Sequence, residues 1–163
     1  MKQWTRVLIA LGILALVALI VLGVDAWQRQ RASTAEIPAG AIPLYLDGKF
    51  AGAFTPADLD GLNKTSFTDA EEGKLQQGWL LRDVIRLHVS PRNLKPDSVI
   101  TITSSSRGKS ATVTWTDADE PANQVMLELS NRGTLKLVSS RLPALDTRNE
   151  WVQDVDRIEV TSP

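Results

Sequence analysis

Every residue from position 7 to position 24 is apolar, and this run of 18 residues, with Val7 and Val24 at its ends, constrains the fold most. As a helix the run is about 27 Å long at about 1.5 Å per residue, close to the hydrocarbon thickness of a bilayer. Trp4 and Trp27 flank the run, where tryptophan rings settle at the two headgroup layers. The sequence therefore predicts a transmembrane anchor over residues 1–27.

The alternative is a cleaved secretory signal, because Lys2 and Arg6 form a basic amino-terminal region and Val24-Asp25-Ala26 offers small residues for cleavage. A signal usually carries about 7 to 15 apolar residues, so the longer run favours an uncleaved anchor. Arg29 and Arg31 follow the run, which makes the positive-inside bias slight. That bias places the amino terminus in the cytoplasm and the remaining chain in the periplasm or at the cell exterior. The predicted location is the bacterial inner membrane, crossed once.

Composition limits what the rest of the chain can do. Residues 28–40 are mostly polar or small and end in Pro38 and Gly40, which predicts a linker and leaves one domain of ordinary size over residues 41–163. From residue 36 onward 14 Lys and Arg stand against 18 Asp and Glu, a net charge of −4. This balance disfavours nucleic acid, which requires a basic face. The absence of cysteine excludes disulfides and thiolate ligands, and the single histidine, His88, excludes a His-rich metal site.

Short alternating or apolar runs predict a domain that is mostly β-sheet. Residues 42–46 and 50–54 flank Asp47-Gly48, which are the residues of a tight hairpin turn. Further strands are predicted over residues 99–103, 111–116, 125–129, 135–138 and 157–160. Turn residues separate these runs.

Two short helices are also predicted. Thr55-Pro56 has the form of a helix cap followed by proline in the first turn, and the helix extends through Leu59 and Leu62. One face of a second helix is formed by Leu81, Val84, Ile85 and His88. The predicted fold class is α+β: a mixed β-sheet with two or three short helices, preceded by one transmembrane helix.

Three polar features resemble known sites but are better explained otherwise. Residues 103–110 end in Gly-Lys-Ser, as a phosphate-binding loop does. However, Thr103 stands where the leading glycine of such a loop is needed, and a strand pattern follows where a helix is needed. A polar hairpin turn is the better interpretation. His88 lacks a paired nucleophile, which favours a helix-end residue over a general base. Two acidic clusters lack calcium-loop spacing and predict solvated loops: Asp69, Glu71 and Glu72, and Asp117, Asp119 and Glu120.

Four segments occur in a specific order. They are FTPADL at residues 54–59, GWLLRDVI at 78–85, GTLKLV at 133–138 and WVQDVDRIEV at 151–160. Together they resemble the molybdopterin-binding domain of the sulfite oxidase type, whose pattern closes on a W-V-k-x-v-x-x-I-e-V strand. The resemblance covers residues 42–160, nearly the whole predicted domain, and implies the fold of that family.

Departures from the family pattern determine the expected function. The resemblance implies a molybdenum-ligating cysteine near residues 64–70, where this chain has none, and a hydroxyl cannot replace a soft thiolate. The family's P-L-R-L-v-v-P stretch is T-L-K-L-V-S-S here, without its prolines. The resemblance therefore implies a non-catalytic binding or accessory module with no bound metal. The alternative is a molybdopterin-dependent redox subunit with a non-cysteine ligand or a partner.

If a ligand cleft persists, the resemblance places cations beside it that suit an anionic or pterin-like ligand. The candidates are Lys136, Arg141 and Arg148, with Arg107 as a weaker addition. The competing interpretation is that these are solvent-facing surface charges. Trp151 and Ile158 are predicted core residues. The expected partners are the lipid bilayer and a membrane or periplasmic protein, and no catalytic or metal-ligating residue is predicted.

Overall fold

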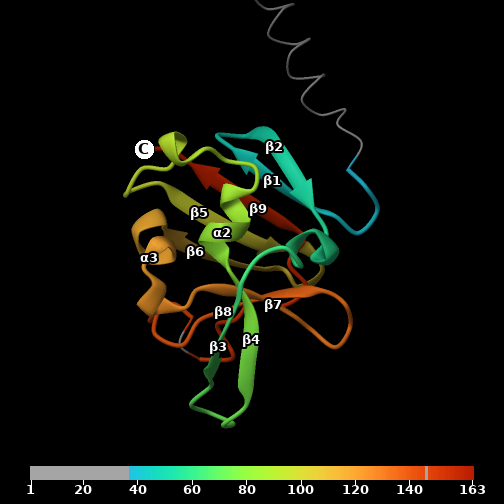
Figure 1. The fold of residues 1–163 in the computed structure, drawn as a ribbon, viewed down its shortest axis with the longest axis vertical. Helices are drawn as coiled ribbons and strands as arrows, with labels where there is room; N and C mark the ends of the chain where they lie inside the picture. Colours follow the sequence, from blue (N-terminus) through green and yellow to red (C-terminus); the bar gives the residue numbers. More distant parts are fainter. Residues whose placement is uncertain (1–36, 146) are drawn as a thin grey trace, which may run out of the picture. The chain divides into compact units, whose positions relative to one another are not determined.

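The computed structural model of the chain describes residues 37–145 and 147–163. The predicted anchor and most of the predicted linker lie outside these residues. Within the described part of the chain, no helix is long and apolar enough to cross a membrane. Residues Ile37–Pro163 form one compact unit that contains two β-sheets and short helices (Figure 1). The predicted α+β class is confirmed, but the strands form two sheets where one was expected.

The first sheet has five strands in the order β2-β1-β9-β5-β6. They are β1 (Ile42–Leu46), β2 (Lys49–Phe54), β5 (Val99–Ser104), β6 (Lys109–Thr114) and β9 (Arg157–Thr161). β1 and β2 pair antiparallel around Asp47 and Gly48, whose φ angles of 51° and 73° are typical of a two-residue hairpin turn. β9 pairs parallel with β1 and antiparallel with β5, so the carboxyl-terminal strand occupies the centre of this mixed sheet.

The second sheet is antiparallel and has the order β3-β4-β7-β8. Its strands are β3 (Lys64–Thr68), β4 (Leu75–Leu80), β7 (Met126–Leu129) and β8 (Leu135–Val138). The sequence did not predict β3 and β4, because their apolar pattern does not follow burial. Leu75 is 67% exposed, whereas its neighbour Gln76 is 3% exposed. The hairpin of β3 and β4 extends away from the five-stranded sheet at the bottom of Figure 1.

The helical elements are short, and their ends differ from the prediction. They are η1 (Pro56–Leu59), α2 (Leu81–Arg86), η2 (Pro91–Asn93), η3 (Ser105–Arg107), α3 (Trp115–Asp119) and η4 (Pro121–Asn123). The first predicted helix is a 3-10 turn that ends at Leu59, and α2 ends before His88. The strand predicted over residues 111–116 ends at Thr114, because the Thr114 hydroxyl accepts the N–H of Asp117 and caps α3.

A single hydrophobic core joins the two sheets and α2. The residues of α2 that face this core, Leu81, Val84 and Ile85, are fully buried. Fully buried apolar residues of the two sheets are Leu44, Ile100, Ile102, Ile158, Val160, Met126, Leu127, Leu135, Leu137 and Val138. Trp151 and Ile158 are 4% and 0% exposed, which confirms that both are core residues. The core therefore fixes the two sheets relative to each other.

Candidate functional site

The four-stranded sheet contains a largely buried ion pair. Lys136 on β8 lies opposite Glu128 on β7 in the strand register, so both side chains stand on one face of the sheet. Lys136 Nζ is 3.2 Å from Glu128 Oε2, and both side chains are 15% exposed. Burial raises the pKa of the Glu128 carboxyl, and the Lys136 ammonium opposes that rise. Lys136 is therefore not a solvent-facing residue, and its charge is paired within the sheet.

A chain of hydrogen bonds extends from this pair to the β3–β4 hairpin. Lys136 Nζ donates to Gln76 Oε1 at 2.9 Å, and Gln76 Nε2 donates to Asp69 Oδ2 at 2.9 Å. Asp69 Oδ1 accepts the backbone N–H groups of Glu71 and Glu72 at 3.1 and 2.7 Å. The Glu72 N–H is the main cause of the lowered pKa of Asp69. Asp69 is 4% exposed, so the prediction of a solvated loop is wrong for Asp69, whereas Glu71 and Glu72 are exposed as predicted.

Trp151 lies against two of the predicted ligand-side cations. Its ring centroid is 5.2 Å from Lys136 Nζ and 5.4 Å from Arg148 Cζ, within the range of cation–π attraction. Phe67 on β3 packs edge-on against the same ring, with the centroids 6.5 Å apart. The indole Nε1 of Trp151 donates to the Leu145 carbonyl at 2.9 Å. The ring is thus fixed in place, and it brings Lys136 and Arg148 to one site.

Arg148 is held by the acidic turn of the β3–β4 hairpin. Its guanidinium forms an ion pair with Glu72, and its side chain is 29% exposed. Its backbone N–H donates to Glu71 Oε1 at 3.3 Å. The residues around this ring, called here the Trp151 cluster, are Asp69, Glu72, Gln76, Glu128, Lys136, Arg148 and Trp151. Both cations of the Trp151 cluster are therefore balanced by carboxylates of the chain itself.

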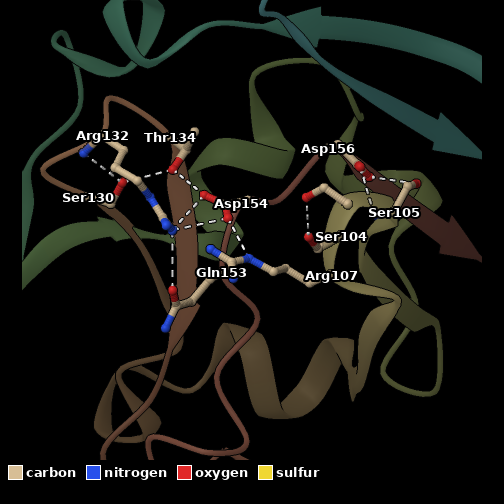
Figure 2. Close-up of polar contacts among 10 residues, drawn as sticks. Ser104, Ser105, Arg107, Ser130, Arg132, Thr134, Gln153, Asp154 and Asp156 are labelled. Carbon is tan, nitrogen blue, oxygen red and sulfur yellow. Dashed lines mark hydrogen bonds and ion pairs between the residues drawn. The ribbon is translucent and has the colours of Figure 1, made fainter.

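Arg107 belongs to a second cluster, in which one carboxylate joins three loops (Figure 2). Asp154 accepts hydrogen bonds from Arg107 Nε at 2.7 Å and from Arg132 at 2.9 and 3.0 Å. The Thr134 hydroxyl donates to Asp154 Oδ1 at 2.7 Å. The Thr134 hydroxyl, followed by the Arg107 guanidinium, lowers the pKa of Asp154. Arg107 therefore connects the β5–β6 turn to the segment before β9 and lies outside the Trp151 cluster.

The polar string that ends in Gly-Lys-Ser is a hairpin turn, as predicted. β5 and β6 pair antiparallel up to Ser104 and Lys109, with η3 and Gly108 between them. The Ser105 N–H and hydroxyl donate to the two carboxylate oxygens of Asp156 at 2.7 and 3.2 Å (Figure 2). The Lys109 ammonium donates to the Asn149 carbonyl. Ser105 and Lys109 of this string are thus used in contacts within the fold.

The remaining candidates lie apart from the Trp151 cluster. His88 is exposed and lies against β2, where a side chain at Gly52 would overlap its ring. Arg141 is exposed, and its backbone N–H donates to Ser139 Oγ at 3.4 Å. The second acidic cluster is not a loop as predicted: Asp117 and Asp119 lie on α3, and Asp119 pairs with Arg86 at 2.7 Å. Among residues 37–145 and 147–163, no three His, Cys, Asp or Glu side chains are grouped to hold a metal ion.

Sequence reasoning missed two members of the Trp151 cluster, Glu128 and Gln76. The pairing of Glu128 with Lys136 could have been predicted, because the two residues lie at equal distances on either side of the turn at Arg132. Gln76 carried no such signal, since it lies 60 positions from Lys136 in the chain. A hairpin register can be counted from its turn, whereas a contact between distant strands cannot.

A scan of the chain against protein-family models finds no match, and a search of curated proteins finds none either. The resemblance to the molybdopterin-binding domain therefore stays a prediction. What the Trp151 cluster can do therefore depends on its own residues. Its cations are paired, its aromatic ring is fixed, and its acidic turn lies against the arginine.

Proposed function

We propose that this chain is a membrane-anchored, non-catalytic module of the molybdopterin-domain type, which binds or assists another component outside the cytoplasm. The observation that carries the proposal is the pairing of charges within the Trp151 cluster. Lys136 pairs with Glu128, and Arg148 pairs with Glu72. An anionic ligand at this site would have to displace a carboxylate from each cation. The charge arrangement therefore favours a module that no longer binds the family's cofactor.

The residues near the expected metal position do not fit a molybdenum pterin. The chain has no cysteine to supply a thiolate. The metal-ligating side chain that residues 64–70 do offer is Asp69, a hard carboxylate, and molybdenum in this family takes a soft ligand. Both Asp69 oxygens already accept hydrogen bonds, from Gln76 and from the backbone of the hairpin turn. These contacts support a module without a resident metal.

Metal and pterin analysis tests the non-catalytic role. The full chain is purified in mild detergent from a host that makes molybdopterin, and its molybdenum content and pterin fluorescence are measured. We expect neither at a stoichiometric level. Stoichiometric molybdenum or a co-purifying pterin would overturn the proposal and favour a redox subunit. Lys136→Gln is the matched variant, because a pterin held by the Trp151 cluster would be lost from it while one held elsewhere would remain.

The location is tested separately. The predicted anchor carries Lys2 and Arg6 on its amino-terminal side, which favours an amino terminus in the cytoplasm. A reporter fused after Pro163 and active on only one side of the membrane should be active in the periplasm. Activity in the cytoplasm would refute the proposed orientation. It would also restrict the partners of the module to cytoplasmic molecules.

A further inference from the structure

A shallow pocket of about 400 Å³ lies at the end of the β1–β2 hairpin. The segment between α2 and β5 forms its other side and is drawn in yellow-green near the carboxyl terminus in Figure 1. Its lining combines three cations with three apolar residues: Lys49, Arg92 and Lys95 with Leu46, Phe50 and Ala51. The pocket shares no residue with the Trp151 cluster, so it is a separate candidate site.

Local structure fixes the backbone on both sides of this pocket. The tight turn at Asp47 and Gly48 places Lys49 opposite Leu46, at the end of the hairpin. On the other side, Leu94 is 8% exposed and anchors the segment that carries Arg92. The Lys95 N–H donates to Ser98 Oγ at 3.0 Å, and Ser98 is fully buried. The three cations are therefore mounted on an ordered backbone.

The cations of this pocket differ from most arginines of the domain, which form ion pairs with carboxylates. Arginines that form ion pairs within the chain are Arg82, Arg86, Arg107, Arg132, Arg148 and Arg157. Across residues 37–145 and 147–163, by contrast, no carboxylate pairs with Lys49, Arg92 or Lys95. Asp47 also lines the pocket, and its Oδ1 accepts the Ser162 N–H at 2.7 Å. Three cations and one carboxylate leave two net positive charges.

We propose that this pocket binds a phosphomonoester group attached to a small apolar body. A phosphomonoester carries a charge of about −1.5 to −2 at pH 7, which complements the charge of the pocket. Arg92 can bind two phosphate oxygens side by side, and the lysines bind as point charges. Phe50 and its apolar neighbours are placed to contact the apolar body. The pocket volume of about 400 Å³ falls within the usual range for small-molecule sites, about 300–1,000 Å³.

The test uses the full chain in phosphatidylcholine nanodiscs, titrated with phenyl phosphate by calorimetry. We expect saturable binding that weakens about tenfold or more in the double variant R92Q/K95Q, because each substitution removes a charged donor. Arg141→Gln is the matched control, since it removes an exposed cation outside the pocket. Its affinity should stay within about twofold of the wild type. Unchanged circular dichroism of each variant shows that the domain remains folded.

A second set of nanodiscs distinguishes the two sources of the phosphate group. When phosphatidic acid is included, a headgroup that fills the pocket lowers the apparent affinity for phenyl phosphate. An unchanged affinity assigns the pocket to a soluble phosphate ester. The absence of saturable binding up to about 10 mM overturns the proposal, and so does an equal loss in Arg141→Gln. Neither result depends on the metal analysis, because the two sites have no residue in common.

Discussion

Replacing Lys136 with methionine tests whether the Trp151 cluster is held together by its charges. The substitution keeps a long apolar stem but removes the ammonium 3.2 Å from Glu128 Oε2 and the donor to Gln76 at 2.9 Å. The Glu128 side chain, 15% exposed, then lacks its counter-ion. Removing one partner of a fully buried pair costs about 3–5 kcal/mol. Because both side chains keep some contact with water, we expect a loss of about 2–3 kcal/mol in the free energy of unfolding.

The penalty should depend on pH, because it arises from an ionised carboxylate. Burial raises the pKa of Glu128, and Lys136 limits that rise. In Lys136→Met the folded-state pKa therefore climbs further. A carboxyl with a raised pKa destabilises the folded state above that pKa, and the effect disappears once the pH falls below the unfolded value of about 4.3. The loss of stability should be full at pH 7 and fall to about 1 kcal/mol near pH 4. The remaining loss at pH 4 comes from the absent hydrogen bond between residue 136 and Gln76.

Urea unfolding of residues 37–163, followed by tryptophan fluorescence at both pH values, measures these losses. The double variant E128Q/K136M should recover about 1–2 kcal/mol relative to Lys136→Met, because no unpaired charge remains. Lys74→Met is the matched control: Lys74 also pairs with a glutamate, Glu72, but is 65% exposed, so we expect no measurable change. A loss that does not vary with pH, or a double variant as unstable as the single one, would contradict the reasoning.

Two further substitutions test other parts of the fold. Asp154→Asn keeps a residue that tolerates the left-handed φ of 55° but removes the charge that Arg107 contacts. Because the pKa of Asp154 is lowered, the carboxylate stabilises the fold above its unfolded pKa of about 3.9, and this stabilisation is lost as the pH falls through the folded pKa. Urea unfolding of the wild type and the variant across pH should show that their difference in stability vanishes in acid. A difference that stays constant with pH would be contrary evidence. Gly78→Ala should lower the free energy of unfolding by about 2 kcal/mol or more, because the new methyl group overlaps the Leu127 carbonyl oxygen. In the control Gly61→Ala the methyl group faces open space, and the change should stay within about 0.5 kcal/mol. Equal unfolding midpoints for the two variants would refute this.

Periodicity predicted the strands whose apolar side chains point into the core. In β5, for example, Ile100 and Ile102 are fully buried and alternate with more exposed residues. The same rule failed at β4, where Leu75 is exposed and Gln76 is buried. Gln76 is buried because its amide bonds both Lys136 and Asp69. A buried polar residue with satisfied hydrogen bonds has no signature in a hydrophobic pattern.

The candidate site was predicted in part. The resemblance selected Lys136 and Arg148, and the fold does bring both to the Trp151 ring. It also selected Arg107, which the structure places in the Asp154 cluster. The carboxylates that pair with these cations were not predicted as partners. Their positions follow from strand pairing and from the turn of a hairpin that the sequence did not reveal.

By itself, the sequence determined the properties that are local or compositional. These are the apolar run over residues 7–24, the turn at Asp47-Gly48 and the lack of any thiolate ligand. The tertiary structure alone decided which charged and polar groups meet: the Lys136 ammonium reaches the Gln76 amide across 60 positions, and the Arg148 backbone N–H reaches the Glu71 carboxylate across 77. The physical reason is that a charge interaction depends on distance and burial, which are set only when the strands pack. Periodicity reports only the direction in which neighbouring side chains point.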